Sequence, residues 1–588
     1  MGKRHARFCG TLAAIALISL LSSCSSNTTS EDRAPKVPAD PPAFVAGEVL
    51  IKFKSTLSAQ SAQSSLASHG LESRDYLAAI GVHRCRITNQ GNALTVAKGC
   101  SQDSMVAFAE PNYVYKASEL PNDPRLSDLW GLQNSNDVDI DAPEAWELEK
   151  GSSDVIVGVI DTGVDYTHED LRDNMWRNPG ESGDGKETNG VDDDANGYVD
   201  DVYGWDFVSN DNDPMDDNQH GSHVAGTIAA VGNNGVGVVG VNWDASVMAL
   251  KFLDGNGSGS AADAISAILY AAENGAHIQN NSWGGGGFSQ SLQDAIEFAR
   301  DRNVLFVAAA GNEGNDNDTS PSYPANYEVS NVLSVAANDR NEKLASFSNV
   351  GATTVDLSAP GVDILSTTPG NGYQSFSGTS MATPHAAGAA ALVVARFPGI
   401  DQRAVLVRLA SSVELNREYE GKTVTGGRLN AVGALSTDPH VAFVTRLQDT
   451  DSSGPFQVMA EAVDDGSVAS AQLVYSVDSG PEVSVAMVSS VPTLYAGEID
   501  AQASASVVQY FVRVTDNAGN SRSSQTFAFQ LSGDGGGGNE PAPCGNVALT
   551  LPGASSGGGP TILMLVSIAL LWLPAWAWTR RTQFRAHM

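Results

Sequence analysis

Apolar runs that end on polar residues recur between residues 154 and 337, and they set the fold class of this chain. Asp154-Val-Ile-Val-Gly-Val-Ile-Asp161 is apolar without alternation, which is typical of a strand buried on both faces of a parallel sheet. Stretches with helical character lie between such runs and predict a three-layer α/β domain. Further runs of this kind are 246–252, 278–282, 304–310 and 332–337, and the helical stretches include 261–274 and 291–302.

Three segments supply reactive side chains to this domain. Functional groups in parallel sheets gather beyond the carboxyl ends of the strands, where Asp161 lies. His220 begins an apolar helix, and Ser380 lies where a loop becomes a helix, a place where free N–H groups favour negative charge. A Gly-Thr-Ser turn before a helix is also typical of an ordinary N-cap. Together, however, the three side chains are those of a nucleophile, its base and an orienting acid.

Three blocks resemble the signature motifs of subtilisin-like serine proteases. They are Val159-Ile-Asp-Thr-Gly-Val-Asp165, His220-Gly-Ser-His-Val-Ala-Gly226 and Gly378-Thr-Ser-Met-Ala-Thr-Pro384, in the chain order that subtilisin uses. The resemblance covers about 120–436. It implies that Ser380 is the nucleophile, His220 the general base and Asp161 the residue that orients the imidazole. His223 and His385 match structural positions of the family.

The resemblance also implies an oxyanion donor and a substrate cleft. Asn312, in Ala308-Ala-Ala-Gly-Asn-Glu-Gly314, matches the side-chain amide that stabilises the oxyanion. Two glycine-containing segments resemble the strands that pair with an extended peptide, and Ser322 falls near the floor of the primary specificity pocket. The expected substrate-binding residues are Gly257, Ser258, Gly259, Ser282, Trp283, Gly284 and Ser322.

The segment between Asp161 and His220 carries an acidic insert. It contains D-x-D-x-N-G, the opening of a calcium loop, but Tyr203 occupies the twelfth position, which excludes an EF-hand. A solvated acidic loop is the alternative, yet clustered carboxylates repel one another and a bound cation relieves this. We therefore expect structural Ca²⁺ here, and the resemblance implies a second site. The expected ligands are Asp192, Asp194, Asn196 and Asp201 in the insert, and Asp170, Asn234, Val236 and Val238 in the second site, whose loop has one residue more than the minimal family pattern.

The N-terminal part divides into three segments. Residues 1–24 predict a lipoprotein-type signal peptide, because a basic and then an apolar stretch lead to Leu21-Ser-Ser-Cys24; an ordinary signal peptide is the alternative. Residues 25–42 predict a disordered linker. Residues 43–118 predict a small α+β propeptide that resembles the inhibitory segments of the family. Within it, Cys85 and Cys100 predict a disulfide, with two buried thiols as the alternative.

The C-terminal part has a different sequence pattern. After the catalytic domain at 119–436, short strand-like runs separated by turns predict a β-sandwich at 437–532, similar to immunoglobulin or fibronectin type III modules. A glycine-rich linker follows at 533–560. Residues 561–588 are apolar with a basic end, near the lower length for a membrane span, and predict either an anchor or a removable sorting tail.

Charge and motifs together define the expected function. A net charge of −34, from 68 acidic and 34 basic residues, argues against nucleic-acid binding. We expect an exported, calcium-stabilised serine endopeptidase, located in the cell envelope or secreted, that is made as an autoprocessed zymogen. Its partners are peptide substrates, its own propeptide and a membrane, reached through the N-terminal lipid or the C-terminal segment. The alternative is a surface adhesion protein with an inactive protease fold, which would not hydrolyse peptides.

Overall fold

The structure, a computed structural model, describes residues 44–54, 57–89, 91–114 and 120–532. The predicted signal peptide, both predicted linkers and the C-terminal hydrophobic segment therefore lie outside the described residues. In the part of the chain that is described, no helix is long and apolar enough to cross a membrane.

The N-terminal segment is a four-stranded antiparallel sheet with two helices. Its strand order is β2-β3-β1-β4, and apolar residues of the strands and of both helices share one core. Cys85 and Cys100 are buried free thiols in this core, so the predicted disulfide is wrong. Burial and the neighbouring Cys100 raise the pKa of Cys85 to about 12, which keeps this thiol protonated. The elements are β1 (Phe44–Phe53), α1 (Ala59–Ser68), β2 (Leu71–Leu77), β3 (Val82–Ile87), α2 (Ala93–Cys100) and β4 (Val106–Tyr113).

A nine-stranded sheet forms the centre of the next region. Its order is β14-β15-β11-β10-β9-β8-β5-β7-β6, and the strands from β11 to β6 pair in parallel. The predicted runs are strands here, as the absence of alternation requires. The strands are β5 (Ile156–Asp161), β6 (Gly204–Asp206), β7 (Ser246–Lys251), β8 (Ile278–Asn281), β9 (Leu305–Ala309), β10 (Val332–Asn338), β11 (Leu357–Pro360), β14 (Glu414–Leu415) and β15 (Gly427–Arg428).

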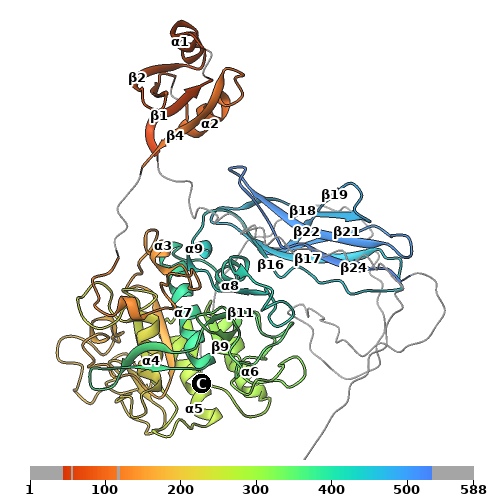
Figure 1. Ribbon diagram of the computed structural model, residues 1–588. Helices are drawn as coiled ribbons and strands as arrows, with labels where there is room; N and C mark the ends of the chain where they lie inside the picture. Colours follow the sequence, from red (N-terminus) through yellow and green to blue (C-terminus); the bar gives the residue numbers. More distant parts are fainter. Residues whose placement is uncertain (1–43, 55–56, 90, 115–119, 533–588) are drawn as a thin grey trace, which may run out of the picture. The chain divides into compact units, whose positions relative to one another are not determined.

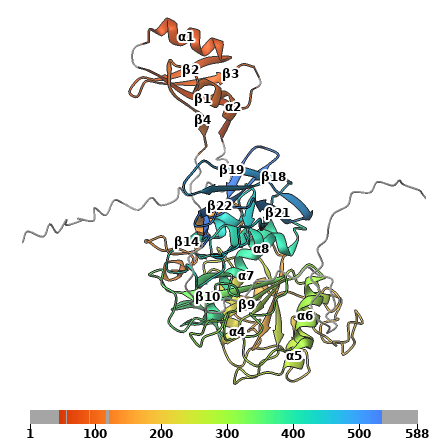
Figure 2. The same cartoon turned by 90° about the vertical axis from the view of Figure 1, so that its right-hand side faces the viewer.

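Helices cover both faces of this sheet (Figure 1 and Figure 2). Alternate residues of β7 belong to different cores. Val247 shares a core with residues of α4 (His220–Ala229), α7 (Thr379–Arg396) and α8 (Gln402–Ser411), and Met248 shares the other core with residues of α5 (Ala261–Glu273) and α6 (Gln290–Arg300). The predicted three-layer α/β arrangement is confirmed. The remaining elements are α3 (Ala142–Trp146), α4 (His220–Ala229), α5 (Ala261–Glu273), α6 (Gln290–Arg300), α7 (Thr379–Arg396), α8 (Gln402–Ser411) and α9 (Ala431–Ala434), the hairpin β12 (Ile364–Thr368) and β13 (Gly372–Phe376), and the 3₁₀ turns Leu126–Asp128 and Arg172–Asn174.

Two further antiparallel sheets follow α9, and they share one apolar core. The first has the order β16-β17-β21-β20 and the second the order β19-β18-β22-β23, with β24 also paired to β22. Arg403 of α8 donates two hydrogen bonds, of 2.7 and 2.6 Å, to Glu461 of β17. The strands are β16 (His440–Ala442), β17 (Phe456–Val463), β18 (Val468–Val477), β19 (Val483–Ala486), β20 (Val488–Val491), β21 (Leu494–Ile499), β22 (Val507–Asp516), β23 (Ser521–Ser523) and β24 (Phe527–Gln530).

Candidate active site

Asp161 and His220 come together at the carboxyl end of β5. Asp161 ends this strand and is fully buried, and His220 is the first residue of α4. His220 Nδ1 lies 2.7 Å from Asp161 Oδ1, so a proton on Nδ1 leaves Nε2 with the lone pair. Burial by itself lowers the pKa of His220, but the charge and hydrogen bond of Asp161 and the charge of Asp216 outweigh it and raise the pKa. This imidazole is therefore suited to accept a proton.

Ser380 is the second residue of α7, whose N-cap is Gly378. Its Oγ donates to the carbonyl of Ser282 (3.0 Å), and Ser282 Oγ donates to the carbonyl of Ser380 (2.9 Å). Ser282 directly follows β8, which pairs with β5 in the sheet. Because carboxyl ends of parallel strands meet at one edge, these bonds fix Ser380 at the edge where Asp161 ends.

Asn312 lies beyond the end of β9, beside the first turn of α7. Its Oδ1 accepts hydrogen bonds from the backbone N–H (2.8 Å) and the hydroxyl (3.0 Å) of Thr379, which leaves Nδ2 as the free donor end of the amide. A Cβ placed on Gly378 would lie 3.6 Å from Ser380 N and 3.7 Å from each of Nδ2 and Oδ1 of Asn312. The space between the two N–H donors is therefore open, as an oxyanion site requires.

The expected substrate-binding residues lie in neighbouring segments. Residues 257–259 are exposed, and a Cβ on Gly259 would come within 2.2 Å of the Phe252 carbonyl, so glycine alone fits there. The Phe252 ring packs edge-on against Trp283, with centroids 4.9 Å apart. A Cβ on Gly284 would lie 3.3 Å from the Tyr323 carbonyl and 3.8 Å from Ser322 Oγ. The three segments thus border one region beside Ser282.

Two comparisons with known proteins agree with this geometry. Residues 152–433 match the family model Peptidase_S8, the subtilase family. The chain is 38% identical over 399 residues to the thermophilic serine proteinase of Bacillus sp. (strain AK1), which covers 67% of this chain and 88% of that protein. The chain belongs to the subtilase family. It is therefore a subtilisin-like serine endopeptidase.

Further matches concern other parts of the subtilase. Residues 30–112 match the Fervidolysin N-terminal prodomain, so the enzyme carries a prodomain and is a zymogen. The chain is 39% identical over 317 residues to thermitase of Thermoactinomyces vulgaris, covering 54% of this chain and 99% of that protein. It is 35% identical over 344 residues to the halolysin-like extracellular serine protease Nep of Natrialba magadii, covering 58% of this chain and 57% of that protein.

The other two histidines near the site are held by packing. His223 Nε2 lies 2.9 Å from the Ile364 carbonyl, and its ring stacks on Phe376 with centroids 4.4 Å apart. His385 Nδ1 lies 2.8 Å from the Met381 carbonyl. Burial lowers the pKa of each to about 4, so both are neutral near pH 7. Neither geometry provides a route for a proton to Ser380.

The acidic insert gathers three carboxylates at one point. Glu181, Asp192 and Asp194 each place an oxygen within 4.8 Å of the others. Glu181 is fully buried, and its Oε2 has no hydrogen-bond partner among the described residues. Asn196 Nδ2 joins this group to the buried Asp201 at 2.9 Å. Burying a carboxylate oxygen without a partner costs free energy of folding. This group of oxygen atoms therefore fits a cation that prefers oxygen ligands.

The second expected metal site also has a member that the sequence did not reveal. Asp170 is fully buried and accepts hydrogen bonds from Asn234 Nδ2 (2.8 Å) and Val238 N (2.9 Å). Burial raises the pKa of Asp170, and the charge of Asp123 acts in the same direction. Asp123 Oδ1 is buried without a hydrogen-bond partner among the described residues. Two neighbouring buried carboxylates with one orphan oxygen again fit a cation.

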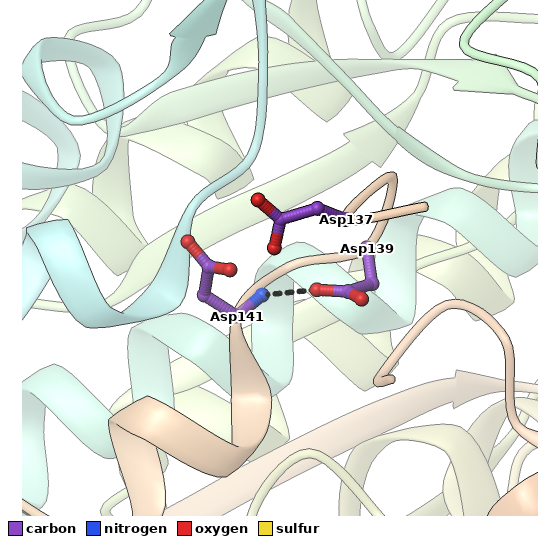
Figure 3. Close-up of side chains that lie close together, drawn as sticks. All are labelled: Asp137, Asp139 and Asp141. Atoms are coloured by element: carbon purple, nitrogen blue, oxygen red, sulfur yellow. Dashed lines mark hydrogen bonds between the residues drawn. The ribbon is translucent and has the colours of Figure 1, made fainter. Parts of the chain in front are cut away.

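A third acidic group lies beside a buried arginine. Figure 3 shows Asp137, Asp139 and Asp141 facing one another before α3, with Asp139 Oδ1 accepting the backbone N–H of Asp141 at 2.9 Å. The buried guanidinium of Arg428 donates to the carbonyls of Asp137 and Asp139, and Asn430 Nδ2 donates to Asp141 at 2.6 Å. Arg428 also pairs with Glu414 and Glu342, and although its charge acts to lower the pKa of Asp139, burial outweighs it and raises that pKa to about 6.

Proposed function

We propose that Asp161, His220 and Ser380 are the catalytic triad of this endopeptidase and that Asn312 donates to the oxyanion. The 2.7 Å contact between His220 Nδ1 and Asp161 Oδ1, at the sheet edge that also holds Ser380, carries this proposal. The alternative, an adhesion protein with an inactive fold, has no support in the site, because every reactive position holds a competent side chain.

The proposed reaction follows from the chemistry of these groups. Ser380 Oγ leaves the Ser282 carbonyl, gives its proton to His220 Nε2 and forms a bond to the scissile carbonyl carbon. The oxyanion lies between Asn312 Nδ2 and the Ser380 N–H. When the C–N bond breaks, His220 returns the proton to the leaving amine. Water then attacks the acyl-enzyme, again through His220, and releases the acid.

A fluorophosphonate tests this assignment directly. We expect the reagent to react with Ser380 of the mature enzyme, so that the label is found on the peptide that contains residue 380. The rate at which the enzyme hydrolyses an unfolded protein substrate should fall in proportion to the fraction of enzyme labelled. The label requires a basic His220, so His220→Ala should abolish it. A mature protein that neither hydrolyses peptides nor takes the label would establish the inactive alternative.

We also propose the domain and substrate assignments that the comparisons leave open. The prodomain at 43–118 blocks the cleft of the catalytic domain at 119–436 until it is cut near 116–123. Residues 257–259 and 282–284 pair with the substrate backbone, and Ser322 leaves room for a large apolar side chain. The two sheets at 437–532 form an immunoglobulin-like β-sandwich, which the core shared by both sheets supports.

Export is a further proposal. Its support is the basic and apolar sequence of residues 1–24 and the similarity to a relative named as an extracellular protease. Membrane attachment would depend on Cys24 or on 561–588, and mass spectrometry of both mature termini would show which segments remain.

We propose two structural Ca²⁺ sites. The first uses Glu181, Asp192 and Asp194, with Asn196 and Asp201 beside them, and the second uses Asp123, Asp170 and Asn234. Carbonyls of Val236 and Val238 would complete the second site. Bound Ca²⁺ would neutralise carboxylates that otherwise repel one another, and it would tie each loop to the sheet.

Removing calcium should lower thermal stability. Each Ca²⁺ at 100 times its dissociation constant contributes about 2.7 kcal/mol, which at about 2.1 cal/mol/K of unfolding entropy per residue corresponds to a fall in Tm of roughly 4 °C per site for the domain at 119–436. The measurement is the melting temperature of fluorophosphonate-inactivated enzyme, which cannot digest itself, with Ca²⁺ and with a chelator. Glu181→Gln and Asp123→Asn should each reduce the difference in Tm between the calcium-loaded and the chelated enzyme. Glu328→Gln, at an exposed position, should leave this difference unchanged. An unchanged Tm with chelator would refute both sites.

A further inference from the structure

A buried carboxylate without an assigned role lies four residues before His220. Asp216 accepts hydrogen bonds at Oδ1 from Thr162 Oγ1 (2.9 Å) and from the backbone N–H groups of Asn218 (2.9 Å) and Gln219 (3.0 Å). Its Oδ2 accepts the backbone N–H of Ser222 (2.9 Å). Gln219, the N-cap residue of α4, makes no side-chain cap bond, so Asp216 caps this helix in its place.

Thr162 joins this cap to the catalytic aspartate. Its backbone N–H donates to Asp161 Oδ1 (2.7 Å), the same oxygen that His220 contacts. Its hydroxyl accepts the N–H of Gly221 (2.9 Å) and uses its one proton for Asp216. The hydroxyl therefore ties the residue after Asp161 to the residue after His220, and Asp216 fixes the direction of that hydroxyl.

Lys251, at the end of the neighbouring strand β7, also contacts the residues after Asp161 and before His220. Its ammonium group is buried and donates to the carbonyls of Thr162 (2.9 Å) and Leu253 (2.8 Å) and to Asp217 Oδ1 (2.6 Å). All three protons of the ammonium are used. Two side chains, Thr162 and Lys251, therefore join the end of β5 to the turn before α4. These contacts explain why a charged lysine is buried beside the site.

The charges near His220 come from several elements. Asp161 lies on β5, Asp216 and Asp217 lie in the turn before α4, Lys251 ends β7, and His223 follows on α4 itself. The negative charge of Asp216 acts on the imidazole in the same direction as that of Asp161, favouring its protonated form. His223 is neutral near pH 7 and adds no charge there.

We propose that Asp216 is a positioning residue of the peptidase reaction: through Thr162 it holds His220 against Asp161, and it supplies a second negative charge beside the imidazolium that forms during catalysis. This inference rests on the proposed triad. In this proposal Asp216 assists the triad although its carboxylate touches neither the substrate nor the reacting atoms.

The test is the pH dependence of kcat/KM for Asp216→Asn. The base must be neutral to act, so the acid limb of the profile reports the pKa of the imidazolium. Loss of the Asp216 charge makes the imidazolium less stable, so the acid limb should move to lower pH. We expect kcat to fall about 10-fold, because the imidazole is held less well, with KM nearly unchanged. Asp213→Asn, an exposed carboxylate three residues earlier, removes one charge from the same loop and should leave the profile in place.

A second pair of variants keeps the proposal testable if Asp216→Asn folds poorly. Thr162→Ser retains the hydroxyl and should retain kcat, whereas Thr162→Val retains the shape and should lose about as much kcat as Asp216→Asn. Fluorophosphonate titration gives the concentration of competent enzyme in each case. An acid limb of Asp216→Asn that coincides with the wild type, or a Thr162→Val enzyme with wild-type kcat, would overturn the proposal. A wild-type enzyme that fails to label would instead refute the triad.

Discussion

Ser380→Ala should accumulate as a precursor with its prodomain still attached, and it should hydrolyse peptides on the order of 10⁶-fold more slowly than the mature enzyme, the size of loss known for the nucleophile of subtilisin. The reason is that Oγ is the atom that bonds to the carbonyl carbon. Once the prodomain has been removed, substrate binding and the oxyanion donors remain, so a small residual rate over water is expected. The measurements are the mass of the purified protein and kcat on a peptide substrate.

The control for this experiment is another serine of the same turn. Ser377 is exposed, and its Oγ accepts the backbone N–H of Asp363 (2.9 Å), so Ser377→Ala should mature and hydrolyse substrate normally. Active enzyme added to the Ser380→Ala precursor should remove the prodomain in trans. If the purified Ser380→Ala protein loses its prodomain by itself at the wild-type rate, autoprocessing by Ser380 is wrong.

The fold of the central domain was predictable because one rule covers most of it. A strand buried on both faces is mostly apolar, and β5, β7 and β9 lie within two residues of the predicted bounds, with polar residues only at the ends of β5 and β7. The position of Asp161 and Asn312 at one edge of the sheet was predictable for a related reason: Asp161 ends β5, Asn312 follows β9, and the carboxyl ends of parallel strands meet at one edge.

Contacts between distant loops were not predictable in the same way. Glu181 joins Asp192 and Asp194 because the insert folds back on itself, and no spacing rule for calcium loops includes a residue 11 positions earlier. Asp123 lies far from Asp170 in the sequence, and only the tertiary structure brings its charge near. The wrong disulfide has a similar cause, since two buried cysteines in one core satisfy the sequence pattern equally well as thiols.

Asn312→Leu should lower kcat about 10²–10³-fold and leave KM nearly unchanged, the range for removing such a donor in subtilisin. A negative charge develops on the carbonyl oxygen only as Ser380 attacks. A donor aimed at that position therefore stabilises the transition state much more than the bound substrate. The measurement is steady-state kinetics, with active enzyme counted by a titrant that reacts with Ser380.

The orientation of the amide makes this prediction specific. Thr379 gives two hydrogen bonds to Asn312 Oδ1, which leaves Nδ2 as the end of the amide that can donate to the oxyanion. Asn315→Leu, an exposed asparagine of the same loop, removes an amide of equal size and should leave kcat unchanged. An Asn312→Leu enzyme with raised KM and wild-type kcat would mean that Asn312 holds the substrate in its ground state. The oxyanion would then depend on the Ser380 N–H and the dipole of α7 alone, and the geometry at Gly378 would need another explanation.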